Sequence, residues 1–174
     1  MIMIISGASH TGKTMLAQKM LEKYNYPYLS IDHLKMGLIR SGRTNLTPLS
    51  SSLLLTEYLW PIVREMIKTV IENDQNLIVE GCYIPDDWSH DFTSEYLDKI
   101  QHYCLIMSEK YIRTHFDDIQ KYAKAIENRG EDDGYTMEML ISENNKVLEA
   151  FQNTKSKLFL IDDEYWLNTF QLYE

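Results

Sequence analysis

Eight residues near the start of the chain carry the clearest chemistry. Residues 7–14 read Gly-Ala-Ser-His-Thr-Gly-Lys-Thr, the G-x-x-x-x-G-K-[ST] pattern known as Walker A. Its glycines allow a close backbone approach, so that consecutive N–H groups can point at phosphate oxygens. We expect Lys13, the lysine of the pattern, to reach the β- and γ-phosphates, and the hydroxyl of Thr14 to bind Mg²⁺. We therefore predict a nucleotide site formed by Gly7, Ala8, Ser9, His10, Thr11, Gly12, Lys13 and Thr14.

The sequence on either side of this loop favours phosphate binding. An apolar run at residues 2–5 predicts a strand that ends at the loop, and Leu16, Met20, Leu21 and Tyr24 have helical spacing after it. A helix that begins here adds the positive end of its dipole to the same anion site. The alternative is a strand-to-helix turn whose glycines serve only the backbone.

Two acidic residues follow later predicted strands. Asp32 comes after a strand predicted at 28–31, and Glu80 ends a strand predicted at 76–80. The carboxyl ends of parallel strands form the ligand crevice of an open sheet, so both carboxylates are expected beside the phosphate loop. Asp32 could accept a proton from an attacking hydroxyl, and Glu80 could hold Mg²⁺ as a Walker B residue does. The alternatives are a helix cap at Asp32 and a solvated strand end at Glu80.

Arginine is scarce, so its positions carry information. The chain has arginines at positions 40, 43, 64, 113 and 129. Arg40 and Arg43 flank a polar segment and are candidates for binding a phosphate or carboxylate of a substrate. Arg129 opens a polar segment at 128–134 and could cover a transferring phosphoryl group. A surface or ion-pair role is the alternative for each, and we favour it for Arg43, Arg64 and Arg113.

Composition limits the remaining possibilities. A chain of 174 residues with 44% hydrophobic residues fits one domain, and a formal net charge of -9 argues against a nucleic-acid partner. Cys82 and Cys104 lie far apart in segments that resemble buried strands, which favours free thiols in a reducing compartment, although a disulfide is possible. With no membrane-length apolar run, we predict a cytoplasmic protein without membrane contact. The histidines show no metal-ligand spacing.

Strand and helix patterns alternate along the chain, which predicts a parallel sheet. Strands are expected at residues 1–6, 28–31, 76–80, 103–107 and 157–161. An apolar double stripe at 62–71 predicts a helix with Pro61 near its start or at a kink, and further helices are expected at 112–126 and 137–151. Tyr83, Pro85 and Trp88 either wall a substrate pocket or pack in the core.

With these residues in place, the chain resembles the small P-loop kinases of the adenylate kinase and shikimate kinase type. Residues 7–14, Asp32 and the lid-like Arg129-Gly130-Glu131-Asp132-Asp133 carry the resemblance. Residues 78–81 with Pro85 are similar to a segment of 2-phosphoglycerate kinase-like and chloramphenicol phosphotransferase-like proteins. The resemblance implies a three-layer α/β/α P-loop NTPase fold with a five-stranded parallel sheet in the order 2-3-1-4-5. It also implies a single domain over residues 1–174, with an acceptor-binding region at about 32–60 and a short helical lid at about 110–140.

The leading hypothesis is an ATP- and Mg²⁺-dependent kinase that phosphorylates a hydroxyl or phosphate of a small metabolite. The scarcity of lid arginines favours an anionic or polyhydroxylated metabolite over a nucleotide as the acceptor. An ATP-binding regulatory switch without a small-molecule acceptor is the alternative, and a protein or sugar-nucleotide acceptor of the zeta-toxin type stays open. A GTPase is disfavoured because the Asn-Lys-x-Asp motif is absent, and a transporter ATPase because Ser-Gly-Gly-Gln is absent.

Overall fold

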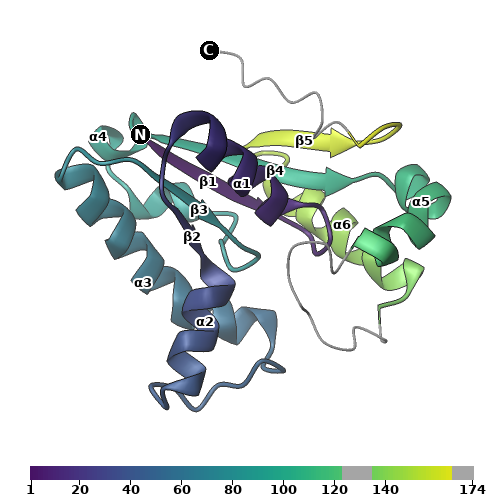
Figure 1. The fold of residues 1–174 in the computed structure, drawn as a ribbon, viewed down its shortest axis with the longest axis horizontal. Helices are drawn as coiled ribbons and strands as arrows, with labels where there is room; N and C mark the ends of the chain where they lie inside the picture. The colour runs from purple at the N-terminus through teal and green to yellow at the C-terminus, as the bar shows by residue number, and fades with distance from the viewer. Residues whose placement is uncertain (123–134, 166–174) are drawn as a thin grey trace.

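A parallel five-stranded sheet forms the centre of the molecule (Figure 1), seen here in a computed structural model that describes residues 1–122 and 135–165. The strand order is β2-β3-β1-β4-β5, and every adjacent pair is parallel, which confirms the predicted 2-3-1-4-5 sheet. The strands are β1 (Ile2–Gly7), β2 (Tyr28–Ser30), β3 (Leu77–Glu80), β4 (Ile100–Met107) and β5 (Lys157–Ile161). The helices are α1 (Lys13–Tyr24), α2 (Ile31–Arg40), α3 (Ser52–Glu72), α4 (Ser94–Leu97), α5 (Glu109–Tyr122) and α6 (Met137–Phe151), with a 3-10 turn η1 (Trp88–Asp91).

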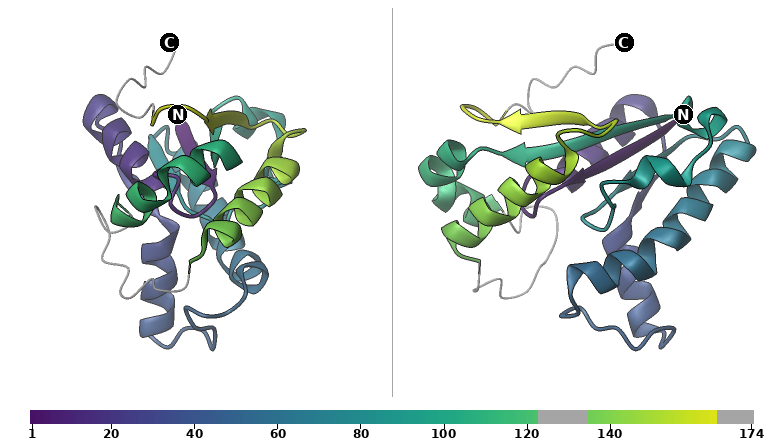
Figure 2. Two further views of the ribbon diagram at one scale, coloured as in Figure 1. Left: turned by 90° about the vertical axis from the view of Figure 1, so that its right-hand side faces the viewer. Right: turned by 180° about the vertical axis from the view of Figure 1, so that it is seen from behind.

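Helices cover both faces of the sheet, because each face of the central strand is apolar. Side chains alternate along a strand, so Ile2 and Ile4 face one side of β1 while Met3 and Ile5 face the other. The first pair packs with α3 and with the end of α6, and the second pair packs with α1 (Figure 2). A third apolar cluster joins α5 and α6 beside the ends of β4 and β5. The result is the predicted three-layer α/β/α arrangement.

Strand β4 begins three residues before its predicted start. Ile100 pairs with Ile2 of β1, so the strand already lies in the sheet at that point. The polar residues Gln101 and His102 hide this start from a pattern search, although His102 is buried. A polar side chain can lie in a central strand when hydrogen bonds satisfy it. Both ring nitrogens of His102 are bonded, to Ser156 Oγ at 2.6 Å and to Ser6 Oγ at 2.8 Å.

Helix α3 is longer than the apolar stripe at 62–71 indicated. It begins at Ser52, where the hydroxyl of Ser51 accepts a hydrogen bond from the N–H of Leu54. Leu55 and Leu59 are buried and extend the stripe toward the N-terminus of the helix. Pro61 therefore lies inside the helix, and the expectation that it stands near the start is wrong. Burial of the first turns offsets the one hydrogen bond that the proline removes.

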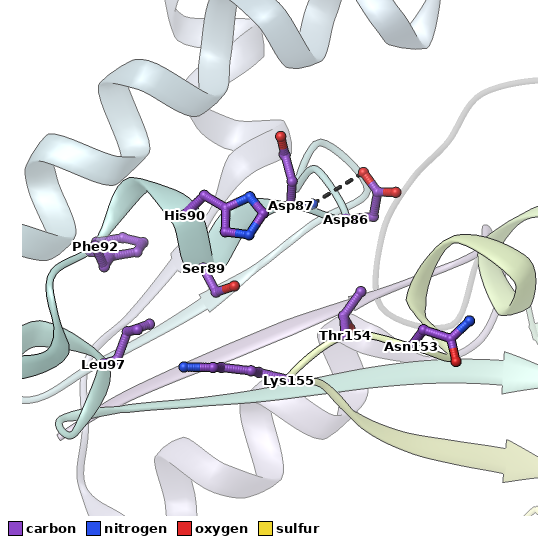
Figure 3. Close-up of a pocket in the computed structure, with 9 residues that line it drawn as sticks. All are labelled: Asp86, Asp87, Ser89, His90, Phe92, Leu97, Asn153, Thr154 and Lys155. Atoms are coloured by element: carbon purple, nitrogen blue, oxygen red, sulfur yellow. Dashed lines mark hydrogen bonds between the residues drawn. The ribbon is translucent and has the colours of Figure 1, made fainter.

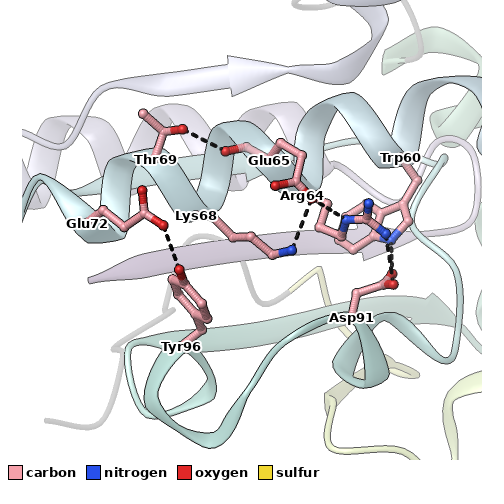
Figure 4. Close-up of polar contacts among 8 residues, drawn as sticks. All are labelled: Trp60, Arg64, Glu65, Lys68, Thr69, Glu72, Asp91 and Tyr96. Carbon is pink, nitrogen blue, oxygen red and sulfur yellow. Dashed lines mark hydrogen bonds and ion pairs between the residues drawn. The ribbon is translucent and has the colours of Figure 1, made fainter.

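Polar contacts fix α3 against the connection between β3 and β4 (Figure 4). The carboxylate of Asp91 in η1 accepts hydrogen bonds from Trp60 Nε1 at 2.7 Å and from Arg64 at 3.0 Å. About two turns further along the helix, the Tyr96 hydroxyl donates to Glu72 at 2.6 Å. Arg64 thus has the ion-pair role that the sequence left as one alternative.

The two cysteines differ in exposure. Both are free thiols, as predicted, and Cys104 is buried in β4. Cys82 is exposed, so its predicted burial is wrong, because β3 ends at Glu80 and the chain has left the sheet. Within residues 1–122 and 135–165, no helix combines the length and apolar character needed to cross a membrane.

Candidate functional site

The phosphate-loop pattern forms a tight turn between β1 and α1. Gly7 has a φ of +139°, and a Cβ at this position would lie 2.3 Å from the carbonyl oxygen of Leu105. Gly12 has a φ of +84° and stands immediately before the first helical residue, Lys13. Residues that carry a side chain rarely adopt either backbone conformation, so the geometry requires both glycines of the motif. His10 also has a positive φ, 63°.

Two side chains of the loop bond back to its own backbone. Lys13 Nζ donates to the carbonyl oxygen of Ala8 at 2.7 Å, and Thr11 Oγ1 donates to the same oxygen at 2.8 Å. Both side chains are buried, so their hydrogen bonds are shielded from water. The lysine charge is therefore held inside the loop, at the N-terminus of α1, where the positive end of the helix dipole adds to it.

Thr14 and Glu80 meet at the carboxyl ends of β1 and β3. The parallel register places Glu80 opposite Ile5, and Thr14 Oγ1 lies 3.4 Å from Glu80 Oε2. Glu80 is only 2% exposed. A hydroxyl and a carboxylate at this spacing fit Mg²⁺, which takes few protein ligands and completes its shell with water and substrate phosphates. Residues 1–122 and 135–165 contain no group of three or more His, Cys, Asp or Glu side chains that could hold a metal ion.

Asp32 lies in the first turn of α2, directly beyond β2. Ser30, two residues before Asp32, pairs with Glu80 across the sheet. Asp32 therefore follows the strand that adjoins the one carrying Glu80. The residue at the N-cap position is Ser30, and the carboxylate of Asp32 instead forms an ion pair with Lys35. Asp32 is one-third exposed, which leaves the carboxylate open to a ligand.

Lys35 and Tyr83 complete the surroundings of Asp32. Lys35 Nζ donates to the Tyr83 hydroxyl at 2.9 Å and also lies 4.8 Å from the centre of its ring. Burial opposes the lysine charge, but the hydrogen bonds that Lys35 donates to Asp32 and Tyr83 outweigh it, so the pKa of Lys35 is raised. Burial likewise raises the pKa of Tyr83. Lys35 was missed in the sequence, although its i+3 spacing from Asp32 could have indicated the pair.

Glu143, in the middle of α6, and Tyr135, just before this helix, reach the phosphate loop. Glu143 Oε1 accepts hydrogen bonds from both the N–H and the hydroxyl of Ser9, each at 2.9 Å. The Tyr135 hydroxyl donates to the other carboxylate oxygen at 2.6 Å. Burial and the hydrogen bond to Glu143 raise the pKa of Tyr135 to about 12. No local pattern could have found these residues, because they lie more than 120 positions from Ser9 in the sequence.

The structure does not bring Arg40 and Arg43 to Asp32. Arg40 lies eight residues beyond Asp32 at the far end of α2, about 12 Å along the helix axis. Both arginines are exposed, and neither forms an ion pair within the part of the chain that the structure describes. Arg113 pairs with Glu109 on the surface of α5. Arg129 and the polar segment at 128–134 lie outside the described residues.

A cavity of about 770 Å³ lies between the β3–β4 connection and the turn before β5 (Figure 3). Its lining includes Asp86, His90 and Phe92 on one side and Thr154 and Lys155 on the other. None of its lining residues belongs to the phosphate loop or surrounds Asp32. Trp88, expected in a pocket wall or in the core, is buried in the core, which is the second of those alternatives.

Solved structures with a similar fold include two whose chains match this one over most of their length. Shikimate kinase from Bacteroides thetaiotaomicron is 15% identical with a TM-score of 0.54, covering 97% of this chain and 92% of its own. The tunicamycin resistance protein of Deinococcus radiodurans is 15% identical with a TM-score of 0.53, covering 92% and 84%. The sequence matches no protein-family model and no curated protein. The chain thus has the fold of the small P-loop kinases.

Proposed function

We propose that this protein is an ATP-dependent kinase that transfers the γ-phosphoryl group to a hydroxyl, or a phosphate, of a small metabolite. The observation that carries the proposal is the gathering of Lys13, Thr14 and Glu80 at one edge of the sheet, with Asp32 on the next strand end. The fold shared with shikimate kinase, named for a small metabolite, supports it. The two free thiols support a cytoplasmic location.

Each residue has a role that follows from its charge and place. Residues 7–14 offer N–H groups to the nucleotide phosphates, and Lys13 stabilises the charge that develops during transfer. Thr14 and Glu80 would hold Mg²⁺, which neutralises charge on the phosphates when bound. Asp32 orients the acceptor hydroxyl and accepts its proton. Arg129, in a lid at about 110–140, would cover the γ-phosphate.

The acceptor would bind in the region of about 32–60, beginning at the Asp32 end of α2. Lys35 offers a positive charge there, and Tyr83 adds a hydroxyl and a ring face. This combination favours an anionic or polyhydroxylated metabolite, because the Lys35 ammonium can exchange its ion pair with Asp32 for one with an anionic group of the substrate. Arg40 and Arg43 could contact only a part of an acceptor that extends along α2.

An acceptor screen that monitors ADP release tests this function. A hydroxyl compound should stimulate ADP release by the wild-type protein, and Lys13→Ala and Asp32→Asn should each reduce the rate by about 100-fold or more. Lys23→Ala, at the end of the same helix α1, is the matched control and should keep the wild-type rate. ATP binding without stimulation by any acceptor would refute the kinase and support the regulatory switch instead.

The acceptor side can be tested separately once an acceptor is known. Lys35→Met should raise the acceptor KM by about tenfold or more while the KM for ATP stays unchanged, and Lys35→Arg should restore part of the loss. A change confined to kcat would place Lys35 outside acceptor binding.

A further inference from the structure

A carboxylate occupies hydrogen-bond donors of the phosphate loop. Both donors of Ser9, the backbone N–H and the hydroxyl, are bonded to the same oxygen of Glu143. Backbone N–H groups of such a loop are the groups that receive phosphate oxygens. Glu143 therefore stands, in part, where an anionic ligand of the loop would be expected.

The position of Glu143 is fixed by its neighbours on α6. The next residue, Asn144, is buried and accepts a hydrogen bond from the N–H of Met107 in β4 at 2.8 Å. Its amide also donates to Leu140 within the helix, so α6 is held against the sheet at this turn. From the other side, the Tyr135 hydroxyl donates to the second oxygen of Glu143. The contact with Ser9 is thus built by several elements.

We infer that Glu143 is an internal competitor for nucleotide phosphates, which must displace its carboxylate from Ser9 when they enter the loop. The inference rests on the proposed function, because it requires the loop to bind nucleotide. This competition makes α6 responsive to nucleotide binding in the phosphate loop, since the helix carries the carboxylate that the nucleotide replaces. Nucleotide binding then exchanges the Glu143 contacts of Ser9 for contacts with phosphate.

Charge decides the direction of the expected effect. ATP brings several negative charges to a loop where Glu143 already supplies one, and like charges at this range repel strongly in a partly buried site. Glu143→Gln removes the charge but keeps an oxygen that can accept from Ser9. We expect this variant to bind a non-hydrolysable ATP analogue about tenfold more tightly than the wild-type protein.

Calorimetry with the analogue and Mg²⁺ tests the inference on four variants beside the wild-type protein. Glu149→Gln removes the same charge from an exposed position of α6 and should bind as the wild type does. Lys13→Ala should lose binding and so identifies the loop as the site. Glu143→Ala removes both the charge and the hydrogen bond and should also tighten binding. It keeps the inference testable if the glutamine variant fails to fold.

The outcomes separate the inference from the function on which it rests. Binding that Lys13→Ala abolishes, with equal or weaker affinity in both Glu143 variants, overturns the inference and leaves the nucleotide site standing. Glu143 would then hold the loop in its binding shape rather than compete. Absence of binding by the wild type and by every variant overturns the proposed function, and the inference with it. Tighter binding by the Glu143 variants, but not by Glu149→Gln, supports the inference.

Discussion

Gly81 is the point where a single added methyl group should disturb both stability and site geometry. A Cβ at Gly81 would lie 2.8 Å from Ile31 Cβ and 3.1 Å from Ile31 Cγ1. Carbon atoms in contact prefer about 3.5–4.0 Å, so Ile31 must move by roughly 1 Å. Ile31 is fully buried at the start of α2, and Asp32 follows it directly. Gly81→Ala should therefore shift the carboxylate as well as strain the core.

The cost can be estimated from this overlap. Overpacking a core typically costs about 1–3 kcal/mol, and a glycine-to-alanine change returns about 0.4–1 kcal/mol through the unfolded chain. Subtracting these ranges leaves a net loss in the free energy of unfolding of about 0–2.6 kcal/mol, and the 2.8 Å overlap with a fully buried side chain favours about 1–2 kcal/mol. For a chain of this size, that corresponds to a fall in Tm of roughly 2–8 °C.

Gly37 provides a control of opposite sign on the same helix. Nothing lies within 4 Å of a Cβ built at Gly37, inside α2. Gly37→Ala should therefore gain about 0.5–1 kcal/mol from helix propensity and raise the Tm by about 1–4 °C. Thermal unfolding of both variants, followed by circular dichroism, makes the comparison. Equal stability of Gly81→Ala and the wild type, or shifts of the same sign in both variants, would refute the reasoning.

Three further predictions concern buried and paired groups. Burial lowers the pKa of His102 from 6.5 to about 3, so the unfolded chain takes up a proton that the folded chain excludes. The stability from this residue is complete above pH 6.5 and falls by about 2 kcal/mol by pH 5, a fall that His102→Gln should flatten in urea unfolding. Asp91→Ala should lower the free energy of unfolding by about 1–3 kcal/mol in the same assay, because it removes a charged acceptor of two hydrogen bonds, whereas Asp74→Asn at an exposed pair should change it by less than about 0.5 kcal/mol. Burial raises the pKa of Cys104 to about 11, so a thiol reagent should label Cys82 alone in the folded protein and both cysteines after unfolding; rapid labelling of both when folded would contradict the described burial.

The sequence predicted the sheet well because apolar runs and strand burial have the same cause. Strands β1 and β3 are buried at every residue on both faces of the parallel sheet, and such apolar runs are visible without a structure. Strand order came from the resemblance to P-loop kinases, since no residue pattern specifies it. The start of β4 escaped because His102 satisfies its ring nitrogens through partners that are distant in sequence. The start of α3 escaped because Pro61 resembled a helix boundary.

The candidate site likewise contains residues that the sequence revealed and residues that only the fold brings together. Residues 7–14 could be found because the loop's chemistry depends on consecutive residues, whose spacing the sequence displays directly. The contacts of Glu143 and Tyr83 depend on the folded arrangement of distant segments, so no spacing reveals them. Arg40 was chosen for the chemistry of its side chain and for its place beside a polar segment, but the length of α2 separates it from Asp32.

The placement of positive charge explains how a chain with a net charge of -9 could still hold anionic ligands. An exposed arginine such as Arg40 acts through water, where salt screens its field within about 10 Å. Lys13 is nearly fully buried and the side chain of Lys35 is only 12% exposed, so each acts through a medium of lower dielectric constant, where the same charge attracts an anion more strongly. Both lysines are also held by short hydrogen bonds to neighbouring oxygens, so little reorganisation precedes binding. Two buried, positioned lysines can thus attract an anionic ligand more strongly than a larger number of surface arginines. The negative surface around them repels anions only at long range.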